Sequence, residues 1–231
     1  GIPFLFKNYE EVDYVRSQLD DSLIAGFAEG GMEVLGIAEG GFGYFLTAEP
    51  VRVPADLQQQ KVWVPQNDVV SARLAQSIGV TPIPLTLPDV LPGLQTGLVN
   101  TVAVSPMGAI VLQWHTRVAH ITDIPLMYFC GVISLTGKSF NKLSADDQAV
   151  VKAVFGKAFK LIDERNRMDN VKAFEALTTQ GVETVVLTDA ERDAWLAMQG
   201  PGEQMMQSQG QLSTEALERV KTLVETFRHS Q

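Results

Sequence analysis

The side chains that most often carry chemistry are few in this sequence, and their spacing does not suit it. His115 and His120 are five residues apart. On a helix they would lie on different faces, and no cysteine or carboxylate stands at ligand spacing beside them, as a zinc site requires. We therefore expect both histidines to be neutral and structural. We also expect no metal site and no cofactor.

Nucleophiles and acid pairs are equally poorly marked. No serine stands in the Gly-x-Ser-x-Gly pattern of a strand-to-helix nucleophile elbow. The single cysteine, Cys130, lies in the apolar run 126–132 without a basic neighbour, which predicts a small buried side chain rather than a reactive thiol. We interpret the carboxylates of residues 146, 147, 163 and 164 as one solvated helix face. We therefore expect no catalytic residue.

Residues 36–43 form a glycine-rich segment, GIAEGGFG. The segment lacks the lysine of a phosphate-binding loop and the glycine spacing of a dinucleotide site. We expect a turn there that brings the backbone close to a ligand or to another strand.

The periodicity of apolar residues predicts the elements that would position these side chains. Predicted helices cover 8–23, 67–78, 89–97, 105–115, 144–177, 188–198 and 213–227, with a short helical step at 54–57. Predicted strands cover 61–65, 81–85, 100–104, 126–135 and 182–187, and 32–46 is predicted as strand, loop, strand. This alternation favours an α/β fold with largely parallel strands. The helix over 144–177 is long, and we expect it to run along two lobes and join them.

The composition limits the class of protein. The 231 residues are 45% hydrophobic, enough for one large domain or two small lobes, and 19% charged, too few for a disordered chain. The net charge of −9 disfavours nucleic acid and anionic membranes as partners, but a pocket can still carry local positive potential. The longest apolar stretches are shorter than the roughly 20 residues that span a bilayer. One cysteine excludes an intramolecular disulfide, which suits the cytoplasm or the periplasm.

Several short motifs, in order along the chain, resemble the solute-binding proteins of TRAP transporters, the DctP-type family. They are PFLF at 3–6, PADL at 54–57, KVWV at 61–64, GVTPIP at 79–84, LQTGLVN at 94–100 and FNKLSADDQ at 140–148. Each motif is weak alone, but together they are fairly specific. The resemblance implies a periplasmic-binding-protein-like α/β fold, with two lobes around a cleft and a long helix spanning both.

The resemblance also suggests how the chain divides. We expect residues 1–38 and 124–160 to form lobe I, incomplete because its N-terminal strands are absent, and residues 39–123 and 161–231 to form lobe II. The opening residues 2–6 read as the end of a buried strand or loop without a basic leader. We therefore expect that upstream residues are missing or removed.

Departures from the family pattern bear on the ligand. Trp63 stands where the family has an arginine that pairs with a ligand carboxylate, and a second family arginine falls on Gly43. Where the family pattern has a polar asparagine, this sequence has Val104 or Ser105, and where the family has a tyrosine, it has Leu91. Because an unpaired buried carboxylate costs several kcal/mol, about 2 or more, we predict a small neutral or largely apolar ligand.

Six residues are predicted to line the cleft: Phe42, Tyr44, Trp63, Gln66, Leu87 and Ser105. Trp63 would stack on the ligand; the alternative is that it packs in the core. Gln66 and Ser105 would supply neutral hydrogen bonds, and Ser105 is also the predicted N-cap of its helix, which would occupy its hydroxyl.

The function implied by the resemblance is an extracytoplasmic, periplasmic solute-binding protein of a TRAP-type secondary transporter. It would capture a small molecule and deliver it to the membrane permease subunits. The departures resemble a subgroup that works with a periplasmic tetratricopeptide-repeat component. Two alternatives stay open: an α/β enzyme with an unrecognised active site, and a scaffold or signalling module of the same fold that binds no solute.

Overall fold

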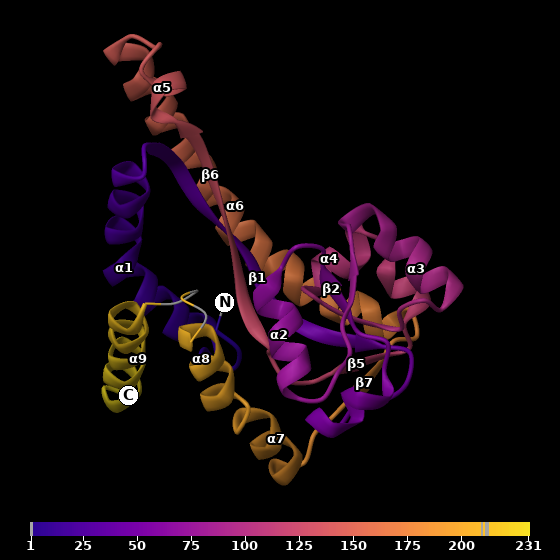
Figure 1. Ribbon diagram of the computed structural model, residues 1–231. Helices are drawn as coiled ribbons and strands as arrows, with labels where there is room; N and C mark the ends of the chain where they lie inside the picture. Colours follow the sequence, from indigo (N-terminus) through magenta and orange to yellow (C-terminus); the bar gives the residue numbers. More distant parts are fainter. Residues whose placement is uncertain (1, 209, 211–212) are drawn as a thin grey trace.

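A computed structural model describes residues 2–208, 210 and 213–231 of the chain (Figure 1). Its helices are α1 (Tyr9–Glu29), α2 (Val69–Ser77), α3 (Val90–Thr96), α4 (Pro106–Val111), α5 (Gly137–Phe140), α6 (Ala145–Thr179), α7 (Asp189–Leu196), α8 (Gln199–Ser208) and α9 (Thr214–His229). Its strands are β1 (Met32–Thr47), β2 (Trp63–Pro65), β3 (Ile83–Leu85), β4 (Thr101–Val104), β5 (His120–Thr122), β6 (Met127–Thr136) and β7 (Glu183–Val185). Short 3-10 turns cover Pro54–Gln59, Leu87–Asp89 and Trp114–Arg117.

Side-chain caps fix where the long helices begin. The hydroxyl of Ser144 accepts the backbone N–H of Asp147 at 3.1 Å and so opens α6, whose 35 residues confirm the predicted long helix. Thr188 and Glu191 form a reciprocal capping box at the start of α7, which begins where the helix over 188–198 was predicted. None of the described helices combines the length and hydrophobicity needed to cross a membrane.

The five-stranded sheet is mixed, so the expectation of largely parallel strands was wrong. In it, β1 pairs antiparallel with β4, β5 and β6, and β5 pairs parallel with β7. β2 and β3 form a separate, parallel two-stranded sheet. The predicted loop within 32–46 was also wrong, because β1 is one continuous strand. Register shifts between Val34 and Gly36 and between Glu39 and Gly41 absorb the extra residues as bulges, and Gly41 takes a φ of +85° that favours glycine.

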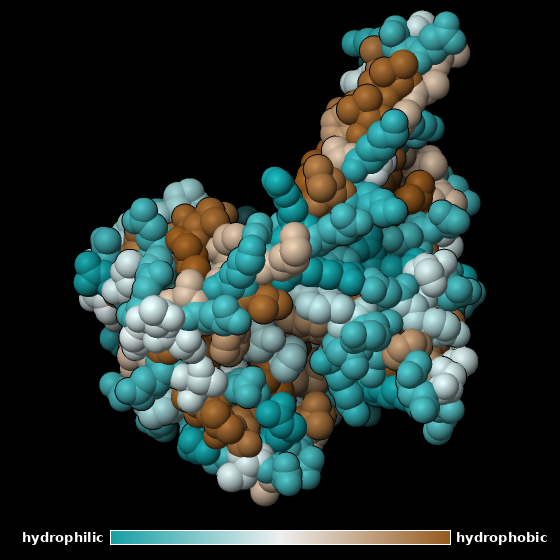
Figure 2. All heavy atoms as spheres, turned by 180° about the vertical axis from the view of Figure 1, so that it is seen from behind, coloured by the Kyte–Doolittle hydropathy of each residue, from teal (hydrophilic) through white to brown (hydrophobic). Residues whose placement is uncertain are grey.

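The outer parts of β1 and β6 form a two-stranded ribbon that projects from the body beside α6 (Figure 1). Apolar side chains are exposed along this arm, and Figure 2 shows them as a brown band. They include Val132, Ile133 and Leu135 on β6 and Val150, Val154, Leu161 and Ile162 on α6. Cys130 lies on the ribbon and is exposed, so the prediction of a buried thiol was wrong. The outer ribbon has too few neighbours to bury it.

The body holds two buried clusters on opposite faces of the strands. Phe45 belongs to the first cluster and Leu46 to the second, because successive side chains of a strand point to opposite faces. The same alternation places Val62 and Val64 in the first cluster and Trp63 in the second. A smaller cluster of Leu5, Val15 and Val224 fastens α9 to α1.

Candidate functional site

An apolar cavity of about 480 Å³ opens in the body beside the first cluster. The cavity is enclosed by strand β2 and the turn after it, by helix α2, by the inner ends of β1 and β6, and by the segment from α7 to α8. Its side chains include Phe4, Phe45, Val62, Val64, Pro65, Leu74, Ala75, Met127, Phe129, Trp195, Met198 and Met206. Such a lining removes apolar surface of a guest from water, which is the main source of affinity for small molecules.

Two side chains with ionisable or hydroxyl groups lie among the described lining residues, Asp68 and Ser71. Asp68 caps α2: one carboxylate oxygen accepts the backbone N–H of Ser71 at 3.0 Å, and the other accepts its hydroxyl at 2.6 Å. Lysine, arginine and histidine do not occur among the lining residues that the structure describes. The cavity is therefore apolar, with one anionic spot at its α2 end.

The backbone near this cavity contains two residues in the left-handed region. Phe4, which lines the cavity, has a φ of 57°, and its N–H donates to the carbonyl of Leu126 at 2.7 Å. Asn67 has a φ of 69° within the turn in which the N–H of Asp68 donates to the carbonyl of Pro65 at 3.0 Å. A positive φ is costly for a bulky residue and is found where surrounding contacts impose it, often at functional sites.

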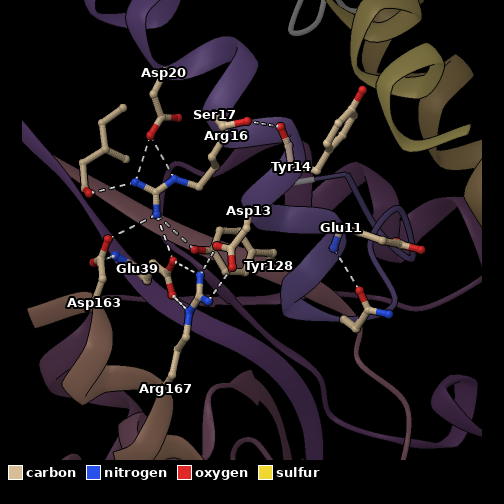
Figure 3. A network of polar contacts seen from close by, with 12 residues as sticks. Glu11, Asp13, Tyr14, Arg16, Ser17, Asp20, Glu39, Tyr128, Asp163 and Arg167 are labelled. Atoms are coloured by element: carbon tan, nitrogen blue, oxygen red, sulfur yellow. Dashed lines mark hydrogen bonds and ion pairs between the residues drawn. The ribbon is translucent and has the colours of Figure 1, made fainter. Parts of the chain in front are cut away.

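A second hollow, of about 580 Å³, lies between α1, β1 and α6 and is strongly charged (Figure 3). At its centre is Glu39, whose side chain is 2% exposed. Glu39 accepts hydrogen bonds from Arg16 at 3.0 Å and from Arg167 at 2.7 Å. Asp163 in turn accepts the backbone N–H of Glu39 at 2.8 Å. The network therefore joins a strand to two helices.

The charges of this hollow largely satisfy one another. Burial alone would lower the pKa of Arg16, but the hydrogen bond and charge of Asp20 outweigh it and raise that pKa. The hydrogen bonds that Arg167 donates to the carboxylates of Asp13 and Glu39 raise the pKa of Arg167. Because both guanidinium groups are already committed to carboxylates, we interpret this hollow as a structural clamp rather than as a solute site.

Three of the predicted site residues are aromatic. Trp63 borders the apolar cavity, yet its indole packs edge-on against Trp114 in the second cluster, with ring centroids 5.1 Å apart, and its N–H donates to the carbonyl of Leu85 at 3.1 Å. Phe42 is buried beside Tyr9, with ring centroids 5.0 Å apart. Tyr44 packs on Phe174, and burial raises its pKa to about 12.

Of the six predicted residues, Trp63 alone is among the described residues that line the cavity; Phe42, Tyr44 and the other three lie outside this lining. Gln66 is exposed in the turn between Pro65 and Asp68, both of which line the cavity. Leu87 is 53% exposed. Ser105 is the N-cap of α4 and accepts the N–H of Gly108 at 3.3 Å, so its hydroxyl is occupied as expected. A role of any of the six in ligand binding stays a prediction.

Sequence reasoning missed most of the cavity wall. Phe129, which the sequence placed only in the predicted strand 126–135, lines the cavity, and its ring fills the space beside Gly43: a Cβ on Gly43 would overlap the ring of Phe129. Arg16, Glu39 and Arg167 were also missed, because charged residues far apart in the sequence give no local signal of a shared site. Asp163, expected on a solvated face, belongs to this clamp.

The histidines fit structural roles. Nδ1 of His115 lies 3.1 Å from the carbonyl oxygen of Ala109, and Nδ1 of His120 lies 3.8 Å from a carboxylate oxygen of Glu183. Within the described residues, no three metal-binding side chains gather at one point.

Comparison with known families gives one clear match. Residues 1–209 match the sequence model of the bacterial extracellular solute-binding proteins, family 7, also called DctP. A solute-binding protein of Sulfitobacter sp. strain NAS-14.1 is 27% identical over 155 residues, which are 65% of this chain and 46% of that protein. The matched region thus spans about half the length of this curated relative.

Solved structures share the fold. A TRAP periplasmic solute-binding protein from Ralstonia eutropha H16 with bound (S)-2-acetolactate has a TM-score of 0.89 and 18% identity, covering 97% of this chain and 73% of its own. The sugar-acid-binding protein of Advenella mimigardefordensis in complex with galactonate has a TM-score of 0.88 and 20% identity, and the match covers 97% of this chain and 72% of that protein. The periplasmic ectoine-binding protein of Halomonas elongata has a TM-score of 0.87 and 20% identity, and the match covers 97% of this chain and 74% of that protein. At these identities the likeness establishes the α/β two-lobed fold alone.

Proposed function

The chain belongs to the bacterial extracellular solute-binding proteins of family 7, and on that premise we propose that it captures a small neutral or largely apolar solute in the apolar cavity. The family is one of binding proteins and not of enzymes, which removes the support for a hidden active site. The cavity volume of about 480 Å³ falls within the range of about 300–1,000 Å³ usual for small-molecule pockets.

The observation that carries the proposal is the absence of a cation from the described lining of the cavity. A buried carboxylate needs a positive or multiple hydrogen-bonding partner, since leaving it unpaired costs several kcal/mol, about 2 or more. The two positions where the family pattern has arginines hold Trp63 and Gly43, and the space beside Gly43 is filled by Phe129. Aromatic and aliphatic contact would thus replace ion pairing as the source of affinity.

We also propose the periplasm as the location and the membrane subunits of a TRAP transporter as the partners that receive the solute. The family description and the TRAP binding proteins that share the fold support both. A tetratricopeptide-repeat component remains a prediction from the sequence. The division of the chain into two lobes also remains a proposal. Lobe I would hold residues 1–38 and 124–160, and lobe II would hold residues 39–123 and 161–231. In this division, β1 and α6 pass from one lobe to the other.

Native mass spectrometry of the freshly purified chain tests the proposal. We expect a fraction of the protein to carry a small molecule that is released on denaturation and is not a carboxylic acid. Isothermal titration with a panel of neutral apolar solutes should then give saturable 1:1 binding. A chain that emerges empty and binds no member of the panel would favour the scaffold alternative.

A cavity-filling variant assigns the binding to this cavity. Ala75 lies on α2 in the cavity wall, so Ala75→Trp should abolish binding by occupying the space. Ala158→Trp is the matched control, because Ala158 is exposed on α6 and does not line the cavity. Circular dichroism verifies that both variants fold. Equal binding by Ala75→Trp and the parent chain would exclude the cavity as the site.

A further inference from the structure

The described polar side chains of the apolar cavity can accept further hydrogen bonds but have few protons left to donate. Asp68 is an acceptor with two oxygens and about four lone-pair positions, of which the two donors of Ser71 occupy two. Ser71 donates its single hydroxyl proton to Asp68, and its hydroxyl oxygen can still accept a hydrogen bond. At this end, the cavity therefore offers a guest places to donate hydrogen bonds to.

The side-chain donors of the described wall are already used. The indole N–H of Trp63 donates to the carbonyl of Leu85 at 3.1 Å, and that of Trp195 donates to the carbonyl of Arg52 at 2.8 Å. Phenylalanine, leucine, valine and methionine side chains make up most of the rest and carry no donor. A guest that needs to accept hydrogen bonds finds no free side-chain donor in this part of the wall.

The start of helix α2 does not compensate. A helix N-terminus attracts anions through its free N–H groups and its dipole. Here the carboxylate of Asp68 already accepts the N–H of Ser71 and places a negative charge at that helix end. A ligand carboxylate at this position would meet the like charge of Asp68.

We propose that the solute is amphipathic, with an apolar body in the cavity and a hydrogen-bond-donating head, best an ammonium group, held by the carboxylate of Asp68. This inference rests on the proposed function, since it assumes that the cavity holds the solute. It makes Asp68 the residue that determines specificity. It also sets this chain apart from the relatives solved with acetolactate and galactonate.

Three probes with one carbon skeleton test the proposal on the full chain: 4-phenylbutylamine, 4-phenylbutanol and 4-phenylbutanoate, titrated calorimetrically at pH 7. We expect the amine to bind about 10-fold more tightly than the alcohol, and the carboxylate to bind most weakly, because a hydrogen bond to a charged group adds more than a neutral one. Binding of the carboxylate as tight as that of the amine would overturn the inference.

The variant Asp68→Asn isolates the charge. Asparagine caps helices as well as aspartate does, so α2 should persist. The amine should lose about 10-fold in affinity while the alcohol changes by less than about 2-fold. Asp147→Asn is the matched control, because Asp147 also pairs with a serine at a helix start, at 2.7 Å from Ser144, but lies outside the cavity. The control should leave all three affinities unchanged.

The outcomes separate the two proposals. If none of the three probes binds while the chain is folded, the cavity is not a solute site and both proposals fail. If the probes bind but Asp68→Asn leaves their order unchanged, or if Asp147→Asn has the same effect as Asp68→Asn, the assignment of a donor head to Asp68 fails. The capture of apolar solutes would then stand without it.

Discussion

Nε of Arg167, on helix α6, donates a hydrogen bond of 2.7 Å to the carboxylate of Glu39, in the middle of strand β1. Arg16 of helix α1 donates to the same carboxylate at 3.0 Å. One buried acid thus fastens two helices to the strand that runs from the body into the arm. Because Glu39 is nearly inaccessible to water, its charge depends on these two arginines for compensation.

Removing the charge of Glu39 should therefore destabilise the fold. For Glu39→Gln we expect the free energy of unfolding to fall by about 3 kcal/mol, because two guanidinium groups lose a buried partner. The control Asp13→Asn removes the other carboxylate that binds Arg167, but Asp13 is 57% exposed, and its loss should cost less than about 1 kcal/mol. Urea denaturation measures both, and equal effects would contradict the clamp.

Trp63 should matter for folding as well as for any ligand. Trp63→Phe removes the indole N–H from the carbonyl of Leu85, which still accepts the N–H of Gln66 at 3.0 Å, so the change should cost about 0.5–1.5 kcal/mol of stability. Trp63→Ala should cost about 3–5 kcal/mol. If Trp63 also stacks on the solute, Trp63→Ala should weaken binding by about 1–3 kcal/mol in protein that is still folded. Unchanged affinity would remove Trp63 from the site and leave its packing against Trp114.

The close approach of Phe129 to Gly43 predicts a severe effect of one methyl group. Gly43→Ala places its Cβ against the ring of Phe129, which should cost about 1–3 kcal/mol and alter the cavity that Phe129 lines. Adding Phe129→Leu to Gly43→Ala should recover part of the loss. Gly156→Ala is the control: no atom lies within 4 Å of its new Cβ, and alanine in helix α6 should stabilise by up to about 1 kcal/mol. Thermal denaturation distinguishes these cases.

Glu191 should make stability depend on pH in the acid range. The hydrogen bond from Arg52, followed by those from Thr188, lowers its pKa from 4.5 to about 2. A lowered pKa in the folded state means that the contribution is complete above about pH 4.5 and is lost as the pH falls toward 2. Glu191→Gln should therefore be less stable than the parent at pH 7, and the difference should close near pH 2. A difference that is constant from pH 7 to pH 2 would contradict this pair as its origin.

Local signals in the sequence predicted the helices well. The predicted helices over 144–177, 188–198 and 213–227 start at Ser144, Thr188 and Ser213, and each of these residues caps its helix in the structure, because a cap depends on the few residues after it. Helix α8 was missed, since Gly200, Pro201 and Gly202 at its start are poor helix formers and tertiary contacts hold it instead.

Long-range pairing was harder to foresee. The antiparallel partners of β1 lie up to about a hundred residues away, and nothing in the local pattern of residues 32–47 distinguishes a bulged continuous strand from strand, loop, strand. The cavity wall has the same limitation: Phe4, Phe129 and Trp195 read as core residues one by one. Trp63 could be identified because a family pattern gave its position a meaning, but the direction of its indole is set by Trp114, which no local signal connects to it.

Helix α6 is long enough to amplify a small rotation at one end into a larger displacement at the other. Its 35 residues extend about 52 Å, from the tip of the apolar arm down to the body, where it packs against β1 and α4. A tilt of about 5° at the body end of a rod of this length displaces the other end by roughly 4.5 Å. Helix α6 contributes none of the described lining residues, but it packs against β1, which places Phe45 in the cavity wall. A tilt of α6 passed on through β1 would therefore be amplified at the tip.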